Sequence, residues 1–235
     1  MIRRPPRSTR KESSAASDVY KRQDGGIASR VDAVPFAVVL NKNGERFYDE
    51  GEDFWPKRYA IWGRLVAGQP EQIAYAIIDS DGVERFMPSV FTAITDNSIE
   101  GLTSQLGLDP KAAKKTLDSF NAACPDGPID QMVLDGRATN GLTPEKTNWS
   151  APISKPPFYG YPLRPGITFT YMGVAVNDRA QVLMQDGKPA ANLFAAGEIM
   201  AGNILGQGYL GGLGMTIGGV FGRIAGAEAA RVLNR

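Results

Sequence analysis

The chain of 235 residues is 43% hydrophobic and carries a formal net charge of +1, from 26 basic and 25 acidic residues. This balance excludes binding to nucleic acid or to a membrane surface that is driven by overall charge. Because the chain has no histidine and one cysteine, histidine-based triads, histidine metal sites and an intrachain disulfide are excluded as well.

Residues 1–23 differ in character from the rest of the chain. They carry seven basic and two acidic residues, are rich in serine and show no apolar period. A transit peptide or a basic arm is one interpretation. We favour a disordered, non-native tail translated from a sequencing adapter, so that the native protein begins upstream of Asp24 and this chain is a C-terminal fragment.

The first native segment predicts a β-hairpin. Residues 34–40 are rich in β-branched and apolar residues, residues 41–44 (NKNG) favour a turn, and residues 46–48 would be the return strand. Residues 49–70 combine four carboxylates with aromatic and basic side chains, and a helix is expected to begin at Pro56. This segment is either a surface loop leading into a helix or a segment that faces the substrate.

Further elements follow from local signals. Residues 72–79 predict a strand, and residues 98–106 a short helix that ends at Gly107. Asp109 is a favourable N-cap, with Pro110 in the first turn of a helix that ends near Cys124. We expect Cys124 to pack rather than react. Residues 125–165 are rich in Pro, Asp and Asn, which predicts an extended connector and a boundary between domains 24–165 and 166–235.

The last domain predicts short strands and a closing helix. Residues 167–171 and 173–176 are β-like, and residues 182–198 indicate two strands around an Asp186-Gly187 turn. Residues 215–233 predict a helix. On it a row of small residues at a spacing of four would let another backbone approach closely: Gly218, Gly222, Gly226 and Ala230.

Eleven of the 27 glycines lie in residues 193–226. The pattern Gly206-x-Gly208-x-x-Gly211 is a poor dinucleotide fingerprint, because no second strand follows the helix. The helix N-terminus could instead stabilise negative charge on a phosphate or on a reduced flavin. Glu198, after a predicted strand, is either an acceptor for ribityl hydroxyls or a solvated loop acid.

Several of these segments resemble one family. AAGE (195–198), the glycine-rich turn and MTIGGVFGRIAGAEAA (215–230) resemble the C-terminal FAD-binding segment of the fumarate reductase/succinate dehydrogenase flavoprotein superfamily. NKNGERFYDE (41–50) resembles the start of its capping domain. Within the superfamily, residues 46–66, 165–173 and 195–218 are most similar to the tricarballylate dehydrogenases.

The resemblance implies an α+β, two-domain flavoprotein with a Rossmann-like FAD-binding domain. Residues 24–165 would form the capping domain, and residues 166–235 the C-terminal part of the FAD-binding domain. Glu198 would bind the ribityl chain, while Gly214 and Met215 would contact the isoalloxazine ring. The other implied cofactor contacts are Gly197, Gly211, Gly212 and Thr216.

The resemblance also implies an activity, FAD-dependent desaturation of tricarballylate to cis-aconitate. Arg58, with Lys57 as second choice, takes the place of the capping-domain proton donor, and Tyr209 that of an arginine near the glycine-rich turn. A di- or tricarboxylate would be held by Lys57, Arg64, Arg164, Thr168 and Thr170. The alternatives are a ketosteroid-dehydrogenase-like or fumarate-reductase-like member, or an inactive fragment.

The expected partners are the small carboxylate and an electron acceptor, either a separate protein or a quinone. No run of about 18 apolar residues is present, so no membrane span is expected. The single cysteine is compatible with a reducing compartment, and we expect a cytoplasmic location.

Overall fold

The computed structural model describes residues 30–166, 169–206 and 209–234, so the interpretation of residues 1–23 lies outside the described residues. The described chain forms two compact units, one within residues 14–166 and one within residues 167–235. We call residues 30–166 the sheet unit and residues 169–234 the glycine-rich unit, and describe each by itself.

The sheet unit is built on a four-stranded antiparallel sheet with the order β1-β2-β4-β3. Its strands are β1 (Val38–Asn41), β2 (Ala74–Ile78), β3 (Ile94–Asp96) and β4 (Phe158–Leu163). In the register of the central strands, Val38 lies opposite Ile77 and Ala74 opposite Leu163. The predicted strand at residues 72–79 is therefore confirmed as β2.

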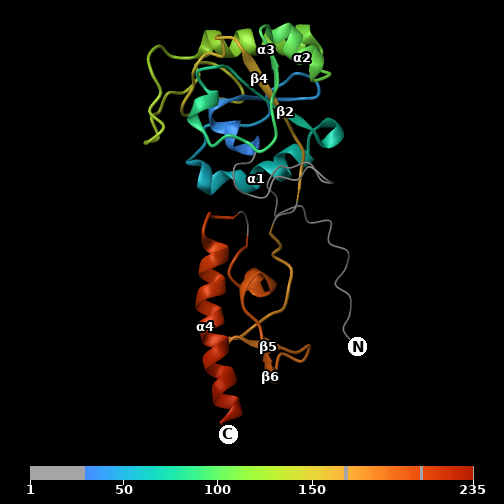
Figure 1. The fold of residues 1–235 in the computed structure, drawn as a ribbon, viewed down its shortest axis with the longest axis vertical. Coiled ribbons are helices and arrows are strands. Elements are labelled where there is room, and N and C mark those ends of the chain that lie inside the picture. Colours follow the sequence, from blue (N-terminus) through green and yellow to red (C-terminus); the bar gives the residue numbers. More distant parts are fainter. Residues whose placement is uncertain (1–29, 167–168, 207–208, 235) are drawn as a thin grey trace. The chain divides into compact units, whose positions relative to one another are not determined.

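Side chains alternate between the two faces of this sheet, as the period of two along a strand requires. Val39 of β1 and Ala76 of β2 belong to a core cluster that includes Trp62 of α1 (Trp55–Ala67). Val38 and Ile77 belong to a second cluster that includes Phe120 of α3. Helices thus cover both faces: α1 on one, and α2 (Ile99–Gln105) and α3 (Pro110–Ala123) on the other (Figure 1).

The three helices begin where the capping residues predict. Pro56 lies in the first turn of α1, and the Ser98 side chain accepts from the Gly101 N–H at the start of α2. Asp109 accepts from the N–H groups of Lys111 and Ala112 at the start of α3. Each of these two side chains satisfies N–H groups that lack a partner within the helix.

The predicted N-terminal hairpin is only partly correct. Residues 34–36 belong to a 3₁₀ helix, η1 (Arg30–Phe36), rather than to a strand, and Pro35 lies within it. The ring fixes φ and removes an N–H, which disfavours a central strand here. The turn forms, with the Gly44 N–H donating to Asn41 O. The predicted return strand is a single bridge between Leu40 and Arg46.

The prediction of an extended connector over residues 125–165 is wrong for its second half. Residues 158–163 form β4, which pairs with both β2 and β3. Lys146 and Ser150 are buried. Proline richness suggested a linker, yet Pro162 is tolerated because β3 reaches β4 only at Phe158, Tyr159 and Gly160. The proline therefore needs no partner on that side.

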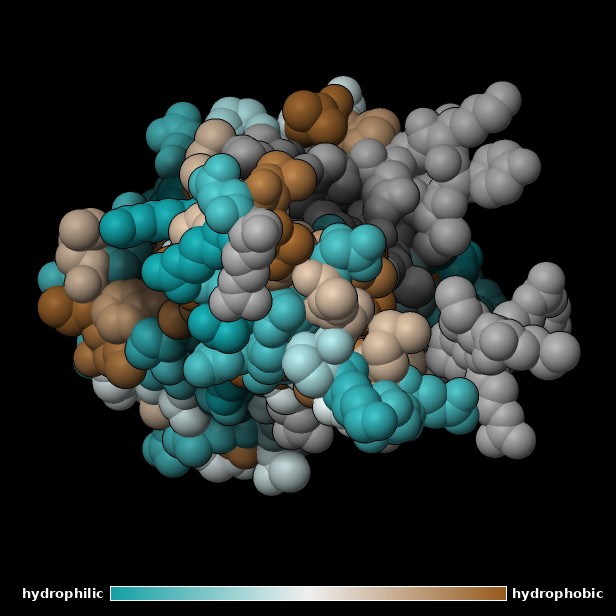
Figure 2. Space-filling view, turned by 90° about the horizontal axis from the view of Figure 1, so that it is seen from below, coloured by the Kyte–Doolittle hydropathy of each residue, from teal (hydrophilic) through white to brown (hydrophobic). Residues whose placement is uncertain are grey.

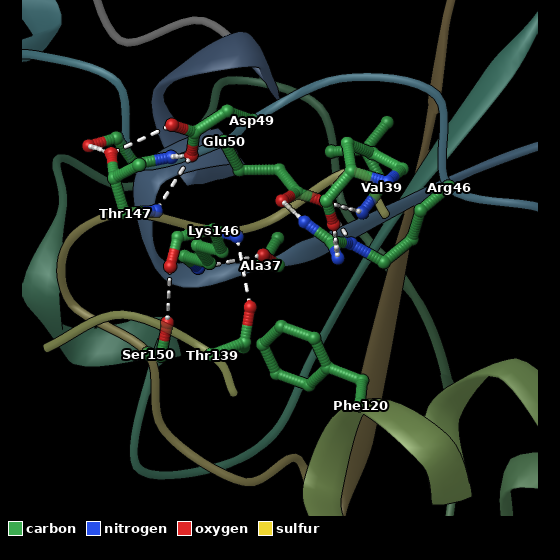
Figure 3. A network of polar contacts seen from close by, with 12 residues as sticks. Ala37, Val39, Arg46, Asp49, Glu50, Phe120, Thr139, Lys146, Thr147 and Ser150 are labelled. Atoms are coloured by element: carbon green, nitrogen blue, oxygen red, sulfur yellow. Dashed lines mark hydrogen bonds and ion pairs between the residues drawn. The ribbon is translucent and has the colours of Figure 1, made fainter. Parts of the chain in front are cut away.

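A buried polar network fixes residues 139–150 against the sheet (Figure 3). Lys146 Nζ donates to Ala37 O at 3.0 Å, and the Lys146 N–H donates to Thr139 Oγ1 at 2.9 Å. The Thr147 hydroxyl donates to Asp49 Oδ2 at 2.6 Å. The bonds to Ala37 and Asp49 connect positions about a hundred residues apart, so the segment is part of the core.

Arg46 and Glu50 form an ion pair within this network. The Arg46 guanidinium bonds both carboxylate oxygens of Glu50 and donates to Pro144 O. Burial lowers the pKa of Lys146 to about 8, against the attraction of Glu50, which raises it. Burial raises the pKa of the Cys124 thiol to about 11, so the thiol stays protonated at neutral pH.

The glycine-rich unit has a smaller core. Its elements are β5 (Gln181–Leu183), β6 (Pro189–Phe194), the 3₁₀ helix η4 (Gly197–Asn203) and α4 (Leu213–Leu233). The predicted strand–turn–strand and the closing helix are confirmed. Residues 169–171 form no strand, and Val176 forms only an isolated bridge to Val182. Residues 167–168 lie outside the described residues.

Much apolar surface of this unit is open to solvent. Ile217 is the one α4 residue counted as buried, whereas Met215 is 87% exposed. A Cβ added at Gly222 or Gly226 would meet no atom within 4 Å among the described residues. The predicted small-residue row is therefore open at these two positions, whereas a Cβ at Gly218 would lie 4.0 Å from Gly197 Cα, a close backbone approach of the predicted kind. Hydrophobic residues appear as brown atoms at the surface in Figure 2.

Candidate functional site

The glycine-rich turn leads directly into α4. Gly212, the residue before the helix, has φ +91°, a left-handed conformation that side chains disfavour. Gly211 and Gly212 are exposed, and a Cβ at Gly212 would meet nothing within 4 Å. Within the part of the chain that the structure describes, the backbone of these two glycines is thus exposed just before α4.

Thr216 does not present its hydroxyl outward. Its Oγ1 donates to Gly212 O at 3.1 Å, and its N–H donates to the same carbonyl. A threonine hydroxyl bonded to the carbonyl four residues earlier is a local helix contact. Thr216 therefore supports the first turn of α4, and its assignment as a cofactor contact stays a prediction.

Tyr209 lies against the first turn of the same helix. Its phenol oxygen accepts a hydrogen bond from the Gly214 N–H at 2.9 Å. The Tyr209 ring contacts the Phe169 ring, with centroids 5.0 Å apart. The sequence singled out Tyr209 and Gly214 for different roles, as a catalytic residue and a cofactor contact. The structure brings them together.

Glu198 and Thr170 also lie together. The Thr170 N–H and hydroxyl donate to Glu198 Oε1 at 2.7 and 2.8 Å. Among the residues that the structure describes, Oε2 of Glu198 has no hydrogen-bond partner. Glu198 is exposed, in the first turn of η4 rather than at a strand end. Gly197, just before it, has φ +82°.

Asn203 holds this segment in place, a role that the sequence did not reveal. Its side-chain amide donates to Val174 O at 2.9 Å and to Met200 O at 2.7 Å. Its Oδ1 accepts from the Val176 N–H at 3.1 Å. An isolated asparagine in a glycine-rich stretch was the only signal, and it does not specify partners nearly thirty residues away.

Two of the predicted cations of the sheet unit, Lys57 and Arg58, are paired with acids. Lys57 Nζ bonds the Asp53 carboxylate at 3.0 Å, and Arg58 bonds Glu52 Oε1. The Tyr48 hydroxyl donates to the other Glu52 oxygen at 2.8 Å. Within the described residues, Arg58 Nε is buried without a hydrogen-bond partner. Glu52 as the Arg58 partner was missed, because no helical spacing connects the two.

The remaining predicted residues are scattered. Arg64 is exposed on α1, and Arg164 Nη1 donates to Glu71 O at 3.1 Å. Thr168 lies outside the described residues. Among the described side chains, no group of three or more Cys, Asp or Glu could hold a metal ion. No helix in the described part of the chain has the length and apolar character needed to cross a membrane.

A family model described as a FAD binding domain matches residues 20–215. The chain belongs to this FAD binding domain family. Membership implies FAD as the cofactor, and the exposed glycine turn and the available Glu198 oxygen fit a bulky polar ligand of that kind. Tyr209 and the start of α4 through Met215 lie within the match.

Curated relatives support the same family. The chain is 31% identical over 206 residues to a urocanate reductase and 35% identical over 207 residues to a digoxin reductase, both from Eggerthella lenta. Each alignment covers 83% of this chain, but 31% and 35% of the relatives. The chain thus spans about a third of the length of these proteins.

A solved structure supports the fold. The open conformation of a flavocytochrome c3 fumarate reductase matches with a TM-score of 0.64 and 26% identity, covering 94% of this chain and 37% of that one. The described chain is therefore an α+β structure that matches part of a FAD-binding flavoprotein fold. The comparisons do not distinguish tricarballylate dehydrogenases within the family.

Proposed function

We propose that this chain is part of an FAD-dependent oxidoreductase that adds hydrogen to, or removes it from, a carbon–carbon bond of a carboxylate or ketosteroid substrate. The observation that carries the proposal is the family match over residues 20–215, which includes Glu198 and Tyr209. Relatives named as reductases and the similar fumarate reductase structure support it.

The substrate is proposed at two levels of detail. A fumarate-reductase-like enzyme is favoured, because the relatives reported above are named as reductases of urocanate, digoxin and fumarate. A ketosteroid-dehydrogenase-like enzyme is the alternative. Desaturation of tricarballylate to cis-aconitate is the finer proposal, supported by the resemblance of residues 46–66, 165–173 and 195–218. Pairing of Lys57 and Arg58 with acids leaves fewer cations for three carboxylates, which favours a smaller anion.

FAD, when bound, supplies a carrier that exchanges a hydride with a substrate carbon. Glu198, with Oε1 held by Thr170, would accept hydrogen bonds from ribityl hydroxyls through Oε2. Met215 would contact the isoalloxazine ring through its backbone, and Gly197, Gly211 and Gly212, which lack a side chain, would let the cofactor approach the backbone. A separate protein or a quinone would exchange the electrons.

The residues of this chain would handle the substrate and its proton. The Tyr209 phenol, held at the start of α4, is the candidate to move the proton of the carbon adjacent to the hydride carbon. Arg58 is the second candidate, although a guanidinium stays protonated in proteins and is therefore better suited to binding a carboxylate than to accepting a proton.

We assign residues 24–165 to a capping domain and residues 166–235 to the end of the FAD-binding domain. Because the chain spans about a third of its relatives, full activity would need flavin-domain residues that this chain does not supply. The open apolar face of α4 fits such a missing neighbour. The alternative is that this chain alone is inactive.

The test has two stages. Purified chain is mixed with FAD, and binding is followed by quenching of flavin fluorescence. In the second stage, the flavin of the protein with a complete flavin domain is reduced by an electron-donating dye, and fumarate, urocanate or a 3-ketosteroid is added. In a parallel experiment the flavin is kept oxidised and tricarballylate is added. Reoxidation by fumarate, or bleaching by tricarballylate, identifies the class. No flavin response to any substrate would contradict the proposal.

Variants at the proposed residues complete the test. Tyr209→Phe and Arg58→Ala should each lower kcat by about a hundredfold, the usual scale for losing an acid–base group. Lys111→Ala, an exposed change on α3, is the control. Wild-type kcat in both variants would refute the site assignment while leaving the family intact.

A further inference from the structure

The contact between Tyr209 and α4 depends on the residue at position 214. The phenol oxygen of Tyr209 accepts from the Gly214 N–H at 2.9 Å. The first turn of a helix leaves N–H groups without partners inside the helix. Here one of them is satisfied by a side chain five residues earlier, a pairing that sets the position of the phenol oxygen.

The missing side chain at position 214 leaves room for this approach. A Cβ at position 214 would lie 2.7 Å from the Tyr209 phenol oxygen and 3.0 Å from Phe169 Cε2. The first distance is shorter than real Cβ contacts, so one partner would have to move. The Tyr209 ring cannot retreat freely, because the Phe169 ring lies 5.0 Å away, centroid to centroid.

We propose that Gly214 is a positioning residue for Tyr209, because its N–H fixes the phenol oxygen and its missing side chain admits the ring. This inference rests on the proposed function, in which Tyr209 moves a substrate proton. An oxygen that accepts a hydrogen bond can still donate its own proton. The contact therefore fixes where Tyr209 acts without consuming the proton that it would transfer.

This role differs from the one that the family resemblance implies. That resemblance makes Gly214 a backbone contact of the isoalloxazine ring. In the structure the Gly214 N–H is used by Tyr209 instead. The absence of a side chain at position 214 is then required by a protein contact, and the requirement exists without any cofactor.

The chain offers a matched control in the same helix. Gly219 also lies in α4, and a Cβ there would meet nothing within 4 Å among the described residues. Gly214→Ala and Gly219→Ala raise helix propensity alike, so they differ mainly in the contact with Tyr209 and Phe169.

The first measurement needs no cofactor. The whole chain is labelled with 3-fluorotyrosine, and the ¹⁹F resonance of Tyr209 is assigned as the one missing from Tyr209→Phe. We expect Gly214→Ala to shift this resonance and Gly219→Ala to leave it unchanged. A Tyr209 resonance that is unchanged in Gly214→Ala would overturn the inference.

The second measurement covers the case in which Gly214→Ala destabilises the fold. Unfolding is followed for Gly214→Ala, Tyr209→Phe and the double variant. Because Phe lacks the oxygen that lies closest to the new Cβ, Tyr209→Phe should partly rescue Gly214→Ala and give no rescue of Gly219→Ala. Strictly additive effects would count against the inference.

Turnover of the complete flavoenzyme separates this inference from the proposed function. We expect Gly214→Ala to lower kcat at least tenfold, and the double variant to be no slower than Tyr209→Phe. A slow Tyr209→Phe with a fast Gly214→Ala refutes the positioning role alone. Wild-type kcat in Tyr209→Phe refutes the catalytic role of Tyr209, and with it the functional meaning of the contact.

Discussion

Thr170 holds Glu198 by two hydrogen bonds to one oxygen: its N–H and its hydroxyl donate to Oε1 at 2.7 and 2.8 Å. The two residues are 28 positions apart in the chain. Their contact makes the orientation of the Glu198 carboxylate a property of the folded unit, and it connects a predicted substrate residue with a predicted cofactor residue.

Thr170→Val tests this relationship. The variant keeps the backbone bond and loses the hydroxyl bond, which is worth about 1 kcal/mol. In the complete flavoenzyme the Kd for FAD should rise about fivefold. Thr170→Ser, which keeps a hydroxyl, is the control. An unchanged Kd in Thr170→Val, measured by flavin fluorescence, would show that Thr170 does not orient Glu198 for the cofactor.

Gly173→Ala should destabilise the glycine-rich unit. A Cβ at this position would lie 1.7 Å from Ile199 O, a carbonyl that already accepts the Val174 N–H. Forced displacement of packed backbone costs about 1–3 kcal/mol. Urea unfolding is followed by circular dichroism, with Gly219→Ala as the matched control. Equal midpoints for both variants would contradict the close approach seen here.

Lys146 predicts an unusual pH dependence for the sheet unit. Its pKa is lowered from 10.5 to about 8. Between these values the unfolded state binds a proton that the folded state does not. This lysine therefore makes the folded state more stable as the pH rises from about 8 to 10.5. Below about pH 8 Lys146 is charged in the folded state as well, and the folded state then bears the full cost of burying that charge.

The comparison with Lys146→Met isolates this effect. Wild-type stability relative to the variant should grow over that pH range, as measured by tryptophan fluorescence in urea, because all three tryptophans lie in the sheet unit. Cys124 and Tyr161 have raised pKa values and act in the opposite direction in both proteins. Lys155→Met is the opposite case. Because Asp81 raises the pKa of Lys155, the stability of the wild type relative to this variant should fall as the pH rises. A pH-independent difference for Lys146→Met would be inconsistent with a buried, destabilised ammonium.

Asp109→Ala should weaken the start of α3. The carboxylate accepts from two N–H groups of the first turn, and replacing such a cap by alanine costs about 0.5–2 kcal/mol. Tryptophan fluorescence in urea should show a lower midpoint with an unchanged slope. Asp118→Ala, on the exposed face of the same helix, should change the midpoint less.

The elements that were predicted correctly depend on local chemistry. Pro56, Ser98 and Asp109 mark helix starts, because a cap or a first-turn proline acts within one turn of backbone. Asp186-Gly187 marks the β5–β6 turn in the same way, with Gly187 at φ +79°. These signals need no knowledge of distant residues.

The errors arise where distant residues decide the outcome. Residues 158–163 were expected in a connector, yet they pair with β2, which lies about eighty residues earlier. Residues 34–36 satisfy a strand pattern, but Pro35 and the packing of η1 on the sheet favour a 3₁₀ turn. Propensity is a weak prior when tertiary pairing competes with it.

For the candidate site, the residue types were predictable and their partners were not. Glycine density and an isolated Glu198 predict a ligand-binding stretch, because these residues have few other uses in an apolar segment. Whether Glu198, Tyr209 and Arg58 act as assigned stays a prediction, as does the division at residue 165.

The sequence alone determined that helices begin around Pro56 and Asp109, that a turn lies at Gly187 and that the start of the last helix is rich in glycine. Only the tertiary structure decided which partners meet. Lys146 donates to Ala37 O, Thr170 donates to Glu198, and the Gly214 N–H donates to the Tyr209 phenol oxygen. The physical reason is the distance along the chain over which each interaction acts. Caps and turns are settled within a few residues, whereas these contacts depend on which surfaces meet when the chain folds.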